Sequence, residues 1–309
     1  MLTANLVYNL SNHQVARYWP TAQIPKREVK EAAAEVLERA TNVLRHATAG
    51  GRPHSLALTA GLDSRTLLAA VINAGLAPKT YTYGVKDNTQ LDRAFSADLA
   101  KQVGLSHEEV ADNTATADEL AALRIAHYAA HHPGAAVALR DWYGDLKALA
   151  LTANLLEIGR TFYVRSYSKP ELRPDTASGM AQLHLGAMSG PVRKDKASRP
   201  EENWLGYSQE RFAYWIKESQ FNSVRHILDP FDQFYWEHRM SAWHGAAMLE
   251  RDFYAEALIP FNCRAIFEAM LGLSVEERQA GAIQYELIRQ VDPALLDLPI
   301  NPEVWPPAE

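Results

Sequence analysis

The chain has 309 residues, 47% of them hydrophobic, so it can bury a sizeable core, and its net charge of −6 argues against a general binder of polyanions. No apolar run approaches the roughly 20 residues that span a bilayer, the first residues lack a signal-peptide pattern, and the single cysteine, Cys263, excludes an internal disulfide. These properties predict a soluble, cytoplasmic protein.

Strands and helices alternate along the first half of the sequence. Residues 1–25 contain short extended pieces and are interpreted as a small hairpin or a lead-in segment. Apolar residues follow helical spacing from Lys26 to about Ala47, and Gly50 and Gly51 end that helix. The alternation that follows predicts an α/β fold, a parallel sheet with helices on both faces. Its strands are predicted at 55–59, 80–84, 107–110 and within 149–159, and its helices at 64–74, 91–103 and 116–131.

Composition divides the chain into four parts. Residues 1–25 form the lead-in segment, and residues 26–165 form the α/β core. Residues 166–203 are rich in Pro, Gly, Ser and basic side chains, which predicts a mobile basic loop. Residues 204–309 are predicted to be a helical C-terminal part that packs on the core and closes with a proline-rich tail.

The stretch LALTAGLDSR, residues 56–65, joins a buried strand to a helix through a turn of small residues. Open parallel sheets bind ligands beyond the carboxyl ends of their strands, and a helix that begins there offers free N–H groups to anions. We expect Gly61 to adopt a left-handed conformation that brings the backbone close to a ligand. The alternative is an ordinary turn with a polar helix start.

The polar residues of this turn have the chemistry of a phosphate site. The hydroxyls of Thr59 and Ser64 are expected to donate hydrogen bonds to phosphate oxygens. Arg65 is expected to neutralise phosphate charge, and Asp63 to hold a magnesium ion. The Gly-Lys-Ser/Thr ending of a Walker loop is absent, so a loop of a different kind is indicated.

The segment TAGLDSR, residues 59–65, resembles the pyrophosphate-binding loop Ser-Gly-Gly-x-Asp-Ser of ATP pyrophosphatases. Its Leu-Asp-Ser continuation is similar to the synthetase half of the asparagine synthase-like family in particular. The resemblance implies a fold like that of the adenine nucleotide alpha hydrolases, with ATP and Mg²⁺ as cofactors. The ATP and pyrophosphate site that it implies consists of Leu58, Thr59, Ala60, Gly61, Asp63, Ser64, Arg65, Tyr83 and Gly84.

Neighbouring stretches extend the resemblance over residues 26–300. The strand TYTYG, residues 80–84, stands where the relatives line the adenine pocket. The stretch after it carries Asp92 and a late histidine, His107, in the family's order, although an amphipathic helix with a chance histidine fits equally well. Residues 256–279 resemble the family's Pro-Phe-x-Asp segment.

The segment TANLLEIGRTFY is similar to a second family motif, Asp-Glu-Leu-Phe-x-Gly-Tyr. The resemblance places Glu157 at the second metal position beside Asp63, and Tyr163 at the motif's tyrosine. The glycines that precede the motif are missing, and Arg160 is expected to compensate for them. A plain surface acid is the alternative for Glu157.

The resemblance implies an ATP-dependent, AMP-forming ligase that adenylates a carboxylate and transfers it to an amine or ammonia, forming an amide. Asp63, Glu157, Arg160 and Tyr163 would be its catalytic residues, and Asp63 and Glu157 its metal ligands. The general base stays open between Glu157, Tyr163 and a histidine. The late family lysine is missing, and its charge is expected from the basic loop, where a solvated charge run is the alternative. The candidates there are Lys169, Arg193, Lys194 and Lys196.

The expected partners are a small-molecule or peptide carboxylate and an amine, with no membrane and no nucleic acid. The chain begins without the glutaminase domain of glutamine-using relatives, so a separate glutaminase-like or substrate-carrier protein is also possible. Two other functions remain open. One is an ATP pyrophosphatase that modifies an RNA base, and the other is a non-catalytic nucleotide-binding relative.

Overall fold

The computed structural model describes residues 4–84, 90–126, 132–144, 148–186, 199 and 202–301. The chain forms two compact units, each assembled from separate stretches of sequence. Unit 1 contains Met1–Pro25, Ala126–His131 and Thr161–Ala247. Unit 2 contains Lys26–Ile125, His132–Arg160 and Met248–Glu309. The division after residue 25 coincides with the sequence-based boundary, whereas residues 204–309 are shared between the two units.

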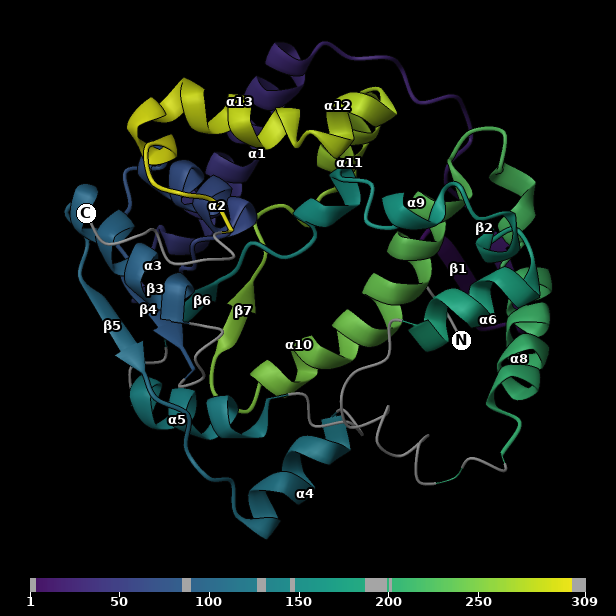
Figure 1. Ribbon diagram of the computed structural model, residues 1–309, viewed down its shortest axis with the longest axis horizontal. Helices are drawn as coiled ribbons and strands as arrows, with labels where there is room; N and C mark the ends of the chain where they lie inside the picture. Colours follow the sequence, from purple (N-terminus) through teal and green to yellow (C-terminus); the bar gives the residue numbers. More distant parts are fainter. Residues whose placement is uncertain are drawn as a thin grey trace. The chain divides into compact units, whose positions relative to one another are not determined.

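Unit 2 is built on a parallel sheet of five strands in the order β5-β4-β3-β6-β7 (Figure 1). Every neighbouring pair is parallel. This confirms the α/β class and the parallel sheet, and it corresponds to a Rossmann-like arrangement. The chain runs from β3 to β4 on one side and reaches β6 on the other, so the strand order reverses between β3 and β6. The strands are β3 (His54–Ala57), β4 (Lys79–Tyr83), β5 (His107–Val110), β6 (Leu149–Leu151) and β7 (Glu256–Leu258).

Helices join and cover these strands. The buried residues of the first helix repeat at helical spacing, as the sequence predicts, and the helix packs on both α2 and α13. The helices and single turns of unit 2 are α1 (Val29–Thr48), α2 (Leu62–Asn73), α3 (Gln90–Gln102), α4 (Ala117–Ala126), α5 (Pro133–Tyr143), η3 (Leu156–Gly159), α11 (Arg264–Leu271), α12 (Val275–Gln279), α13 (Ala282–Val291) and η8 (Pro293–Leu296).

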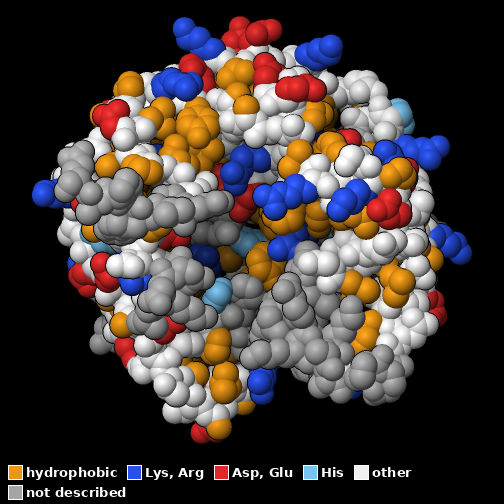
Figure 2. Space-filling view, viewed as in Figure 1, with side chains coloured by type: hydrophobic (Ala, Val, Ile, Leu, Met, Phe, Trp, Pro, Cys, Tyr) orange, Lys and Arg blue, Asp and Glu red, His pale blue; other side chains and the backbone are white. Residues whose placement is uncertain are grey.

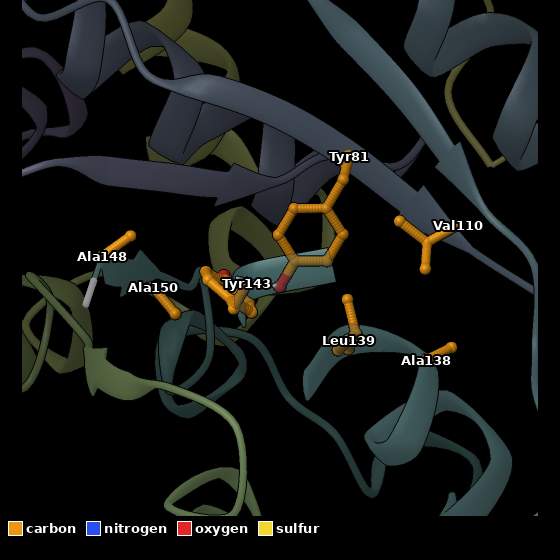
Figure 3. Packing of buried hydrophobic residues seen from close by; sticks show 7 residues of the cluster. All are labelled: Tyr81, Val110, Ala138, Leu139, Tyr143, Ala148 and Ala150. Atoms are coloured by element: carbon orange, nitrogen blue, oxygen red, sulfur yellow. Dashed lines mark hydrogen bonds between the residues drawn. The ribbon is translucent and has the colours of Figure 1, made fainter. Parts of the chain in front are cut away.

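The two faces of β4 pack against different helices because side chains alternate along a strand. Thr82 donates a hydrogen bond to the carbonyl of Leu58 and lies 2.6 Å from the hydroxyl of Ser96 on α3. Tyr81 points the other way, and its hydroxyl accepts a hydrogen bond from Tyr143 at the end of α5. Figure 3 shows the hydrophobic cluster on this second face, which consists of Tyr81, Val110, Ala138, Leu139, Tyr143, Ala148 and Ala150.

Unit 1 begins with an antiparallel hairpin of β1 (Leu6–Asn9) and β2 (Gln14–Arg17). Its core is aromatic and includes Phe212, Trp215 and Phe234. The helices are η4 (Val164–Ser166), η5 (Pro170–Leu172), α6 (Ala177–Gly186), α8 (Trp204–Glu218), η6 (Phe221–Val224), α9 (Pro230–Phe234), the π-helix η7 (Tyr235–His244) and α10 (Gly245–Arg251), the last of which ends in unit 2.

A buried ion pair joins the hairpin to the π-helix. The two guanidinium nitrogens of Arg17 lie 2.5 and 2.9 Å from the carboxylate of Glu237, whose side chain is fully buried. Asn5 donates a further hydrogen bond to Glu237 at 3.0 Å. Several charge-assisted hydrogen bonds to one carboxylate offset the cost of burying it.

The segment predicted as a loop, residues 166–203, contains helical structure where it is described. Helix α6 packs on α8 through buried Met180, Ala181 and Leu183. Composition suggested a loop because glycine and serine are frequent there. The helix forms because packing against α8 buries its apolar residues, which matters more than propensity. Arg193, Lys194 and Lys196 lie outside the described residues.

None of the described helices combines the length and the apolar character that crossing a bilayer requires. Figure 2 shows acidic and basic side chains intermixed at the top of the view, where Figure 1 labels α12 and α13. Intermixed charges of both signs are typical of a solvated helix surface.

Candidate functional site

The candidate site lies in unit 2, where the turn after β3 meets the segment after β6. These two strands are neighbours, and their carboxyl ends lie at the same edge of the sheet. The turn carries Asp63, and the segment carries Glu157 on η3 and Arg160 directly after it. Arg160 donates a hydrogen bond from Nη2 to Oδ2 of Asp63 at 2.5 Å. The structure therefore brings together three of the four residues predicted to be catalytic.

Two carboxylate oxygens at this site have no hydrogen-bond partner within the described part of the chain. They are Oδ1 of Asp63 and Oε2 of Glu157, and both are buried. Burial raises the pKa of Asp63 to about 7. The guanidinium of Arg160 lowers this pKa and the nearby charge of Glu157 raises it further. Buried oxygens without proton donors are costly unless a cation or a protonated group faces them.

The donor set fits Mg²⁺. Magnesium is bound through one or two protein carboxylates together with substrate phosphates, rather than by a full cage of side chains. Accordingly, no cluster of three or more His, Cys, Asp or Glu suited to a metal is found among the described residues. Asp63 and Glu157 would supply the two carboxylates.

The backbone before η3 is strained. Leu155 adopts a φ of 76°, which a side chain of this size rarely takes. Such conformations cost on the order of 1–3 kcal/mol and are frequent at binding sites. Here the turn directs the chain from the end of β6 into the short helix that carries Glu157.

Helix α2 begins at the same place. The N-cap residue before it, Gly61, contributes no side-chain cap, so the first N–H groups of the helix keep the capacity to bind an anion. The positive end of the helix dipole and the buried Oδ1 of Asp63 lie in the same turn. An anion bound to a divalent cation suits both features, because the anion matches the positive helix end and the cation matches the carboxylate oxygen.

The hydroxyls of Thr59 and Ser64 bond to the loop itself. Their oxygens lie 2.9 Å apart, and the N–H of Gly61 donates to Oγ1 of Thr59 at 3.1 Å. Oγ of Ser64 also lies 3.0 Å from the carbonyl of Thr59. The N–H of Ala60 donates to Oδ1 of Asp92 at 3.2 Å. In this structure these groups order the turn.

Gly61 differs from the sequence-based expectation. Its φ of −70° and ψ of 153° are extended rather than left-handed. The space around it is tight instead, because a Cβ there would lie 3.0 Å from Oγ1 of Thr59 and 3.3 Å from Oδ1 of Asn301, so these side chains would have to shift slightly. The position of Asn301, whose N–H donates to the carbonyl of Ala60, could not be inferred from the local sequence.

Arg65 also differs, because it does not face the candidate site. Its side chain is fully buried, and Nη1 donates to the carbonyls of Leu295 and Leu298, at 2.7 Å each. Nη2 donates to the carbonyl of Pro299 at 2.8 Å. Residues two apart on a helix point roughly 200° apart around its axis. Since Asp63 faces the strand ends, Arg65 faces the C-terminal segment, and the expected contact with phosphate is corrected to a structural role.

The remaining predicted loop residues lie at the carboxyl ends of β3 and β4. Leu58 is fully buried, and its N–H donates to the carbonyl of Tyr81 at 2.9 Å. Tyr83 ends β4 and is half-buried. Gly84 adopts a φ of 122°, and its N–H donates to the carbonyl of Val110 at 3.2 Å.

Tyr163 belongs to unit 1, so the structure does not place it relative to Asp63. Its ring packs with those of Phe162, Phe231 and Phe234. Burial raises the pKa of Tyr163 to about 12, and the charge of Arg239 lowers it. A phenol with this pKa is a poor general base at neutral pH.

The other predicted residues are placed as follows. Nδ1 of His107 lies 2.8 Å from the hydroxyl of Thr80, and burial lowers the pKa of His107. Both features indicate that His107 stabilises the packing of β4 and β5. Lys169 is exposed and belongs to unit 1.

Sequence reasoning missed two residues near the site, Asn154 and Arg251. It named Asp92 but not the hydrogen bond that Asp92 accepts from the N–H of Ala60. Arg251 ends α10, and Nη2 lies 3.5 Å from Oδ1 of Asn154. Arg251 follows Glu250 at the end of a short, mostly apolar helix, and this local sequence carries no signal of such a position.

No protein-family model matches this chain, and no curated protein sequence is significantly similar to it.

Proposed function

We propose that the chain is an ATP-dependent, AMP-forming ligase that activates a carboxylate and transfers it to an amine or ammonia. The proposal rests chiefly on the two unpartnered carboxylate oxygens of Asp63 and Glu157 beside the uncapped start of α2. A magnesium-bound pyrophosphate matches this combination of negative side chains and free backbone N–H groups. The resemblance of residues 59–65 to a pyrophosphate loop is independent support.

Bound Mg²⁺ would add positive charge where negative charge develops on the departing pyrophosphate. Asp63 and Glu157 would hold it, and the first N–H groups of α2 would bind the phosphate oxygens. Arg160 would orient Asp63 through its hydrogen bond. With Arg65 turned to the C-terminal segment, Arg160 is the cation of this site that can also approach a phosphate.

The reaction would proceed in two steps. A carboxylate oxygen of the substrate attacks the α-phosphorus of ATP, and the bond to pyrophosphate breaks, leaving an acyl adenylate. The nitrogen of the amine then attacks the acyl carbon, the bond to AMP breaks, and the amine loses a proton. The protein accelerates both steps by holding the reactants in position and by excluding water from the adenylate.

One observation favours a second candidate, a nucleotide-binding protein without turnover. The hydroxyls of Thr59 and Ser64 are bonded to each other, and the N–H of Ala60 is bonded to Asp92. A catalytic loop would have to release these groups to a phosphate. The two functions make opposite predictions about exchange of pyrophosphate into ATP.

The test is exchange of labelled pyrophosphate into ATP in the presence of Mg²⁺ and pools of carboxylic acids, amines or tRNA. The ligase predicts exchange that depends on an acid. Exchange that requires tRNA would favour modification of an RNA base, and binding of Mg²⁺-ATP without exchange in any pool would favour the second candidate. Asp63→Asn should abolish exchange, whereas the matched control Asp98→Asn, at an exposed position on α3, should not.

A further inference from the structure

A cavity of about 320 Å³ lies at the amino edge of the sheet in unit 2. Its lining includes Pro53, which precedes β3, Lys79, which begins β4, and Ala148, which directly precedes β6 (Figure 3). Asp63 follows β3 at the opposite end of that strand. The 4 residues of β3 rise by about 3.3 Å each, so roughly 13 Å of strand separates the cavity from the candidate nucleotide site.

Trp142, the last residue but one of α5, forms an aromatic wall of this cavity. Its side chain is half-buried, and its ring is held by a hydrogen bond and by two other rings. Nε1 donates to Oε2 of Glu108 at 2.6 Å, and the ring centroid lies 4.9 Å from that of Tyr81 and from that of Tyr143. An aromatic surface that is already fixed binds a flat ring at little cost in conformational entropy.

The lining also carries positive charge. Lys79 and Arg52 line the cavity, and no Asp or Glu lines it within the part of the chain that the structure describes. Nζ of Lys79 lies 5.9 Å from the centroid of the Trp142 ring, so the positive charge and the aromatic surface are neighbours. Small-molecule sites have volumes of about 300–1,000 Å³ and combine mostly apolar walls with a few polar groups. A volume at the lower end of this range suits a molecule of one or two rings.

Neighbouring acids limit the charge that such a molecule can carry. Nζ of Lys79 lies 3.5 Å from Oε1 of Glu108, and Nη2 of Arg52 lies 2.7 Å from Oε2 of Glu256. These carboxylates offset part of the positive charge and would repel a second negative charge on the ligand. An ammonium group has three donors, so Lys79 can bind an anion while it stays beside Glu108. The charges therefore favour a monoanion over a dianion such as a phosphate ester.

We propose that this cavity binds a small aromatic carboxylate. The ring packs against the indole of Trp142, and the carboxylate accepts a charge-assisted hydrogen bond from Nζ of Lys79, with Arg52 adding positive charge. The site goes beyond the proposed ligase function and does not depend on it, because it lies at the other edge of the sheet from Asp63 and Glu157.

The test is calorimetric titration of the full chain with benzoate and indole-3-carboxylate. Each of three comparison probes changes one property: cyclohexanecarboxylate lacks the aromatic ring, benzamide lacks the charge, and phenyl phosphate carries a second charge. We expect one molecule of an aromatic carboxylate to bind about 5-fold more tightly than cyclohexanecarboxylate and at least about 10-fold more tightly than benzamide. It should also bind more tightly than phenyl phosphate, and equally well with and without saturating Mg²⁺-ATP.

Two variants assign the contacts. Lys79→Gln should weaken binding of the aromatic carboxylate about 10-fold and remove its advantage over benzamide. Trp142→Leu should weaken it about 5-fold and remove its advantage over cyclohexanecarboxylate. Because Lys79 is exposed, Lys79→Gln tests the inference even where the packing around Trp142 does not tolerate leucine. The matched control is Lys101→Gln, at an exposed position on α3, which should bind as wild type does.

Absence of binding of both aromatic carboxylates would overturn the inference, as would unchanged binding in Lys79→Gln or a preference for phenyl phosphate. Displacement of the bound probe by Mg²⁺-ATP would also overturn it, because the probe would then occupy the nucleotide site. The proposed ligase fails separately, in the pyrophosphate exchange assay. A protein that binds benzoate through Lys79 but shows no exchange keeps the cavity site and loses the ligase, and the reverse result keeps only the ligase.

Discussion

Arg160 holds Asp63 by a 2.5 Å hydrogen bond although 97 residues separate them in the sequence. The contact exists because β3 and β6 are neighbours, so the chain segments that leave them meet. Arg160 occupies Oδ2 of Asp63, and Oδ1 is buried without a hydrogen-bond partner among the residues that the structure describes. One oxygen is thus fixed by the protein, and the other has the capacity to bind a cation.

The raised pKa of Asp63 makes stability depend on pH. Its pKa rises from 3.8 to about 7 on folding, so the folded protein holds a proton that the unfolded chain loses. The contribution of Asp63 to the free energy of unfolding should therefore be largest below pH 4. It should fall by on the order of a few kcal/mol as the pH rises to 7. Denaturant unfolding between pH 5 and 8 measures this slope.

Asp63→Asn should remove the part of the pH dependence of stability that Asp63 causes. At pH 8 the variant should be at least as stable as wild type. Mg²⁺ with ATP should flatten the wild-type slope, because it stabilises the ionised carboxylate. A slope that is identical in wild type and Asp63→Asn would contradict the assignment of the titration to Asp63.

Arg160→Gln should test whether Arg160 positions the carboxylate of Asp63. The change removes the positive charge that lowers the pKa of Asp63, so this pKa should rise further. Affinity for Mg²⁺-ATP at pH 7 should fall by about 10-fold or more and should recover in part at higher pH. Equilibrium binding over a pH series measures both effects. The exposed Arg165 provides the control Arg165→Gln, which should behave as wild type.

Arg65→Lys should destabilise unit 2 near its C-terminal segment. The guanidinium serves the carbonyls of Leu295, Leu298 and Pro299, and an ammonium group cannot reproduce its planar fork. Loss of one or two such bonds from a buried site costs on the order of 2–4 kcal/mol. Hydrogen exchange should show faster opening of residues 293–301. If only nucleotide affinity changed, with exchange unaffected, Arg65 would instead have the phosphate contact expected from the sequence.

Arg65 also shows which part of the site the sequence could predict. The turn and its helix follow from local patterns, and the resemblance to a known family implied that Asp63 and Glu157 lie together. The orientation of Arg65 and the tight fit of Gly61 depend on residues 295–301, more than 200 positions away. No local pattern encodes such a contact.

The same reasoning applies to the fold. Strands β3 and β4 were predicted because apolar or β-branched runs end at turn residues, and β5 was predicted at residues 107–110 as a short third strand of the alternation. Strand β7, Glu256–Leu258, was missed because it has three residues and packs at the edge of the sheet. Helix α6 was missed because tertiary packing on α8 overrides a glycine- and serine-rich composition. The nucleotide-binding superfamily remains a prediction.

His238 should make unit 1 sensitive to acid. Its ring stacks on Phe234 with centroids 4.9 Å apart, and burial, together with the charges of His184 and Arg239, lowers its pKa from 6.5 to about 3. The unfolded chain therefore binds a proton that the folded protein excludes, and stability should be lost as the pH falls from about 6.5 toward 3. His238→Phe preserves the stacking and should shift acid unfolding to lower pH.

Fluorescence of Trp215, whose ring centroid is 5.7 Å from that of His238, is suited to following this transition. The exposed His226 supplies the control His226→Phe, which should leave the midpoint of acid unfolding unchanged. If the two variants unfolded at the same pH as wild type, the acid sensitivity of unit 1 would have to arise from groups other than His238.

The contacts between α2 and the C-terminal segment have a consequence for synthesis on the ribosome. The carbonyl of Pro299, which Arg65 binds, is made 234 residues after Arg65 itself, and Asn301 joins Ala60 still later. The turn after β3 is therefore translated early but reaches its final shape only when nearly all of unit 2 has emerged. A nascent chain would carry the turn, β3 and α2 without the contacts that hold them, and ligand binding would begin with the finished fold.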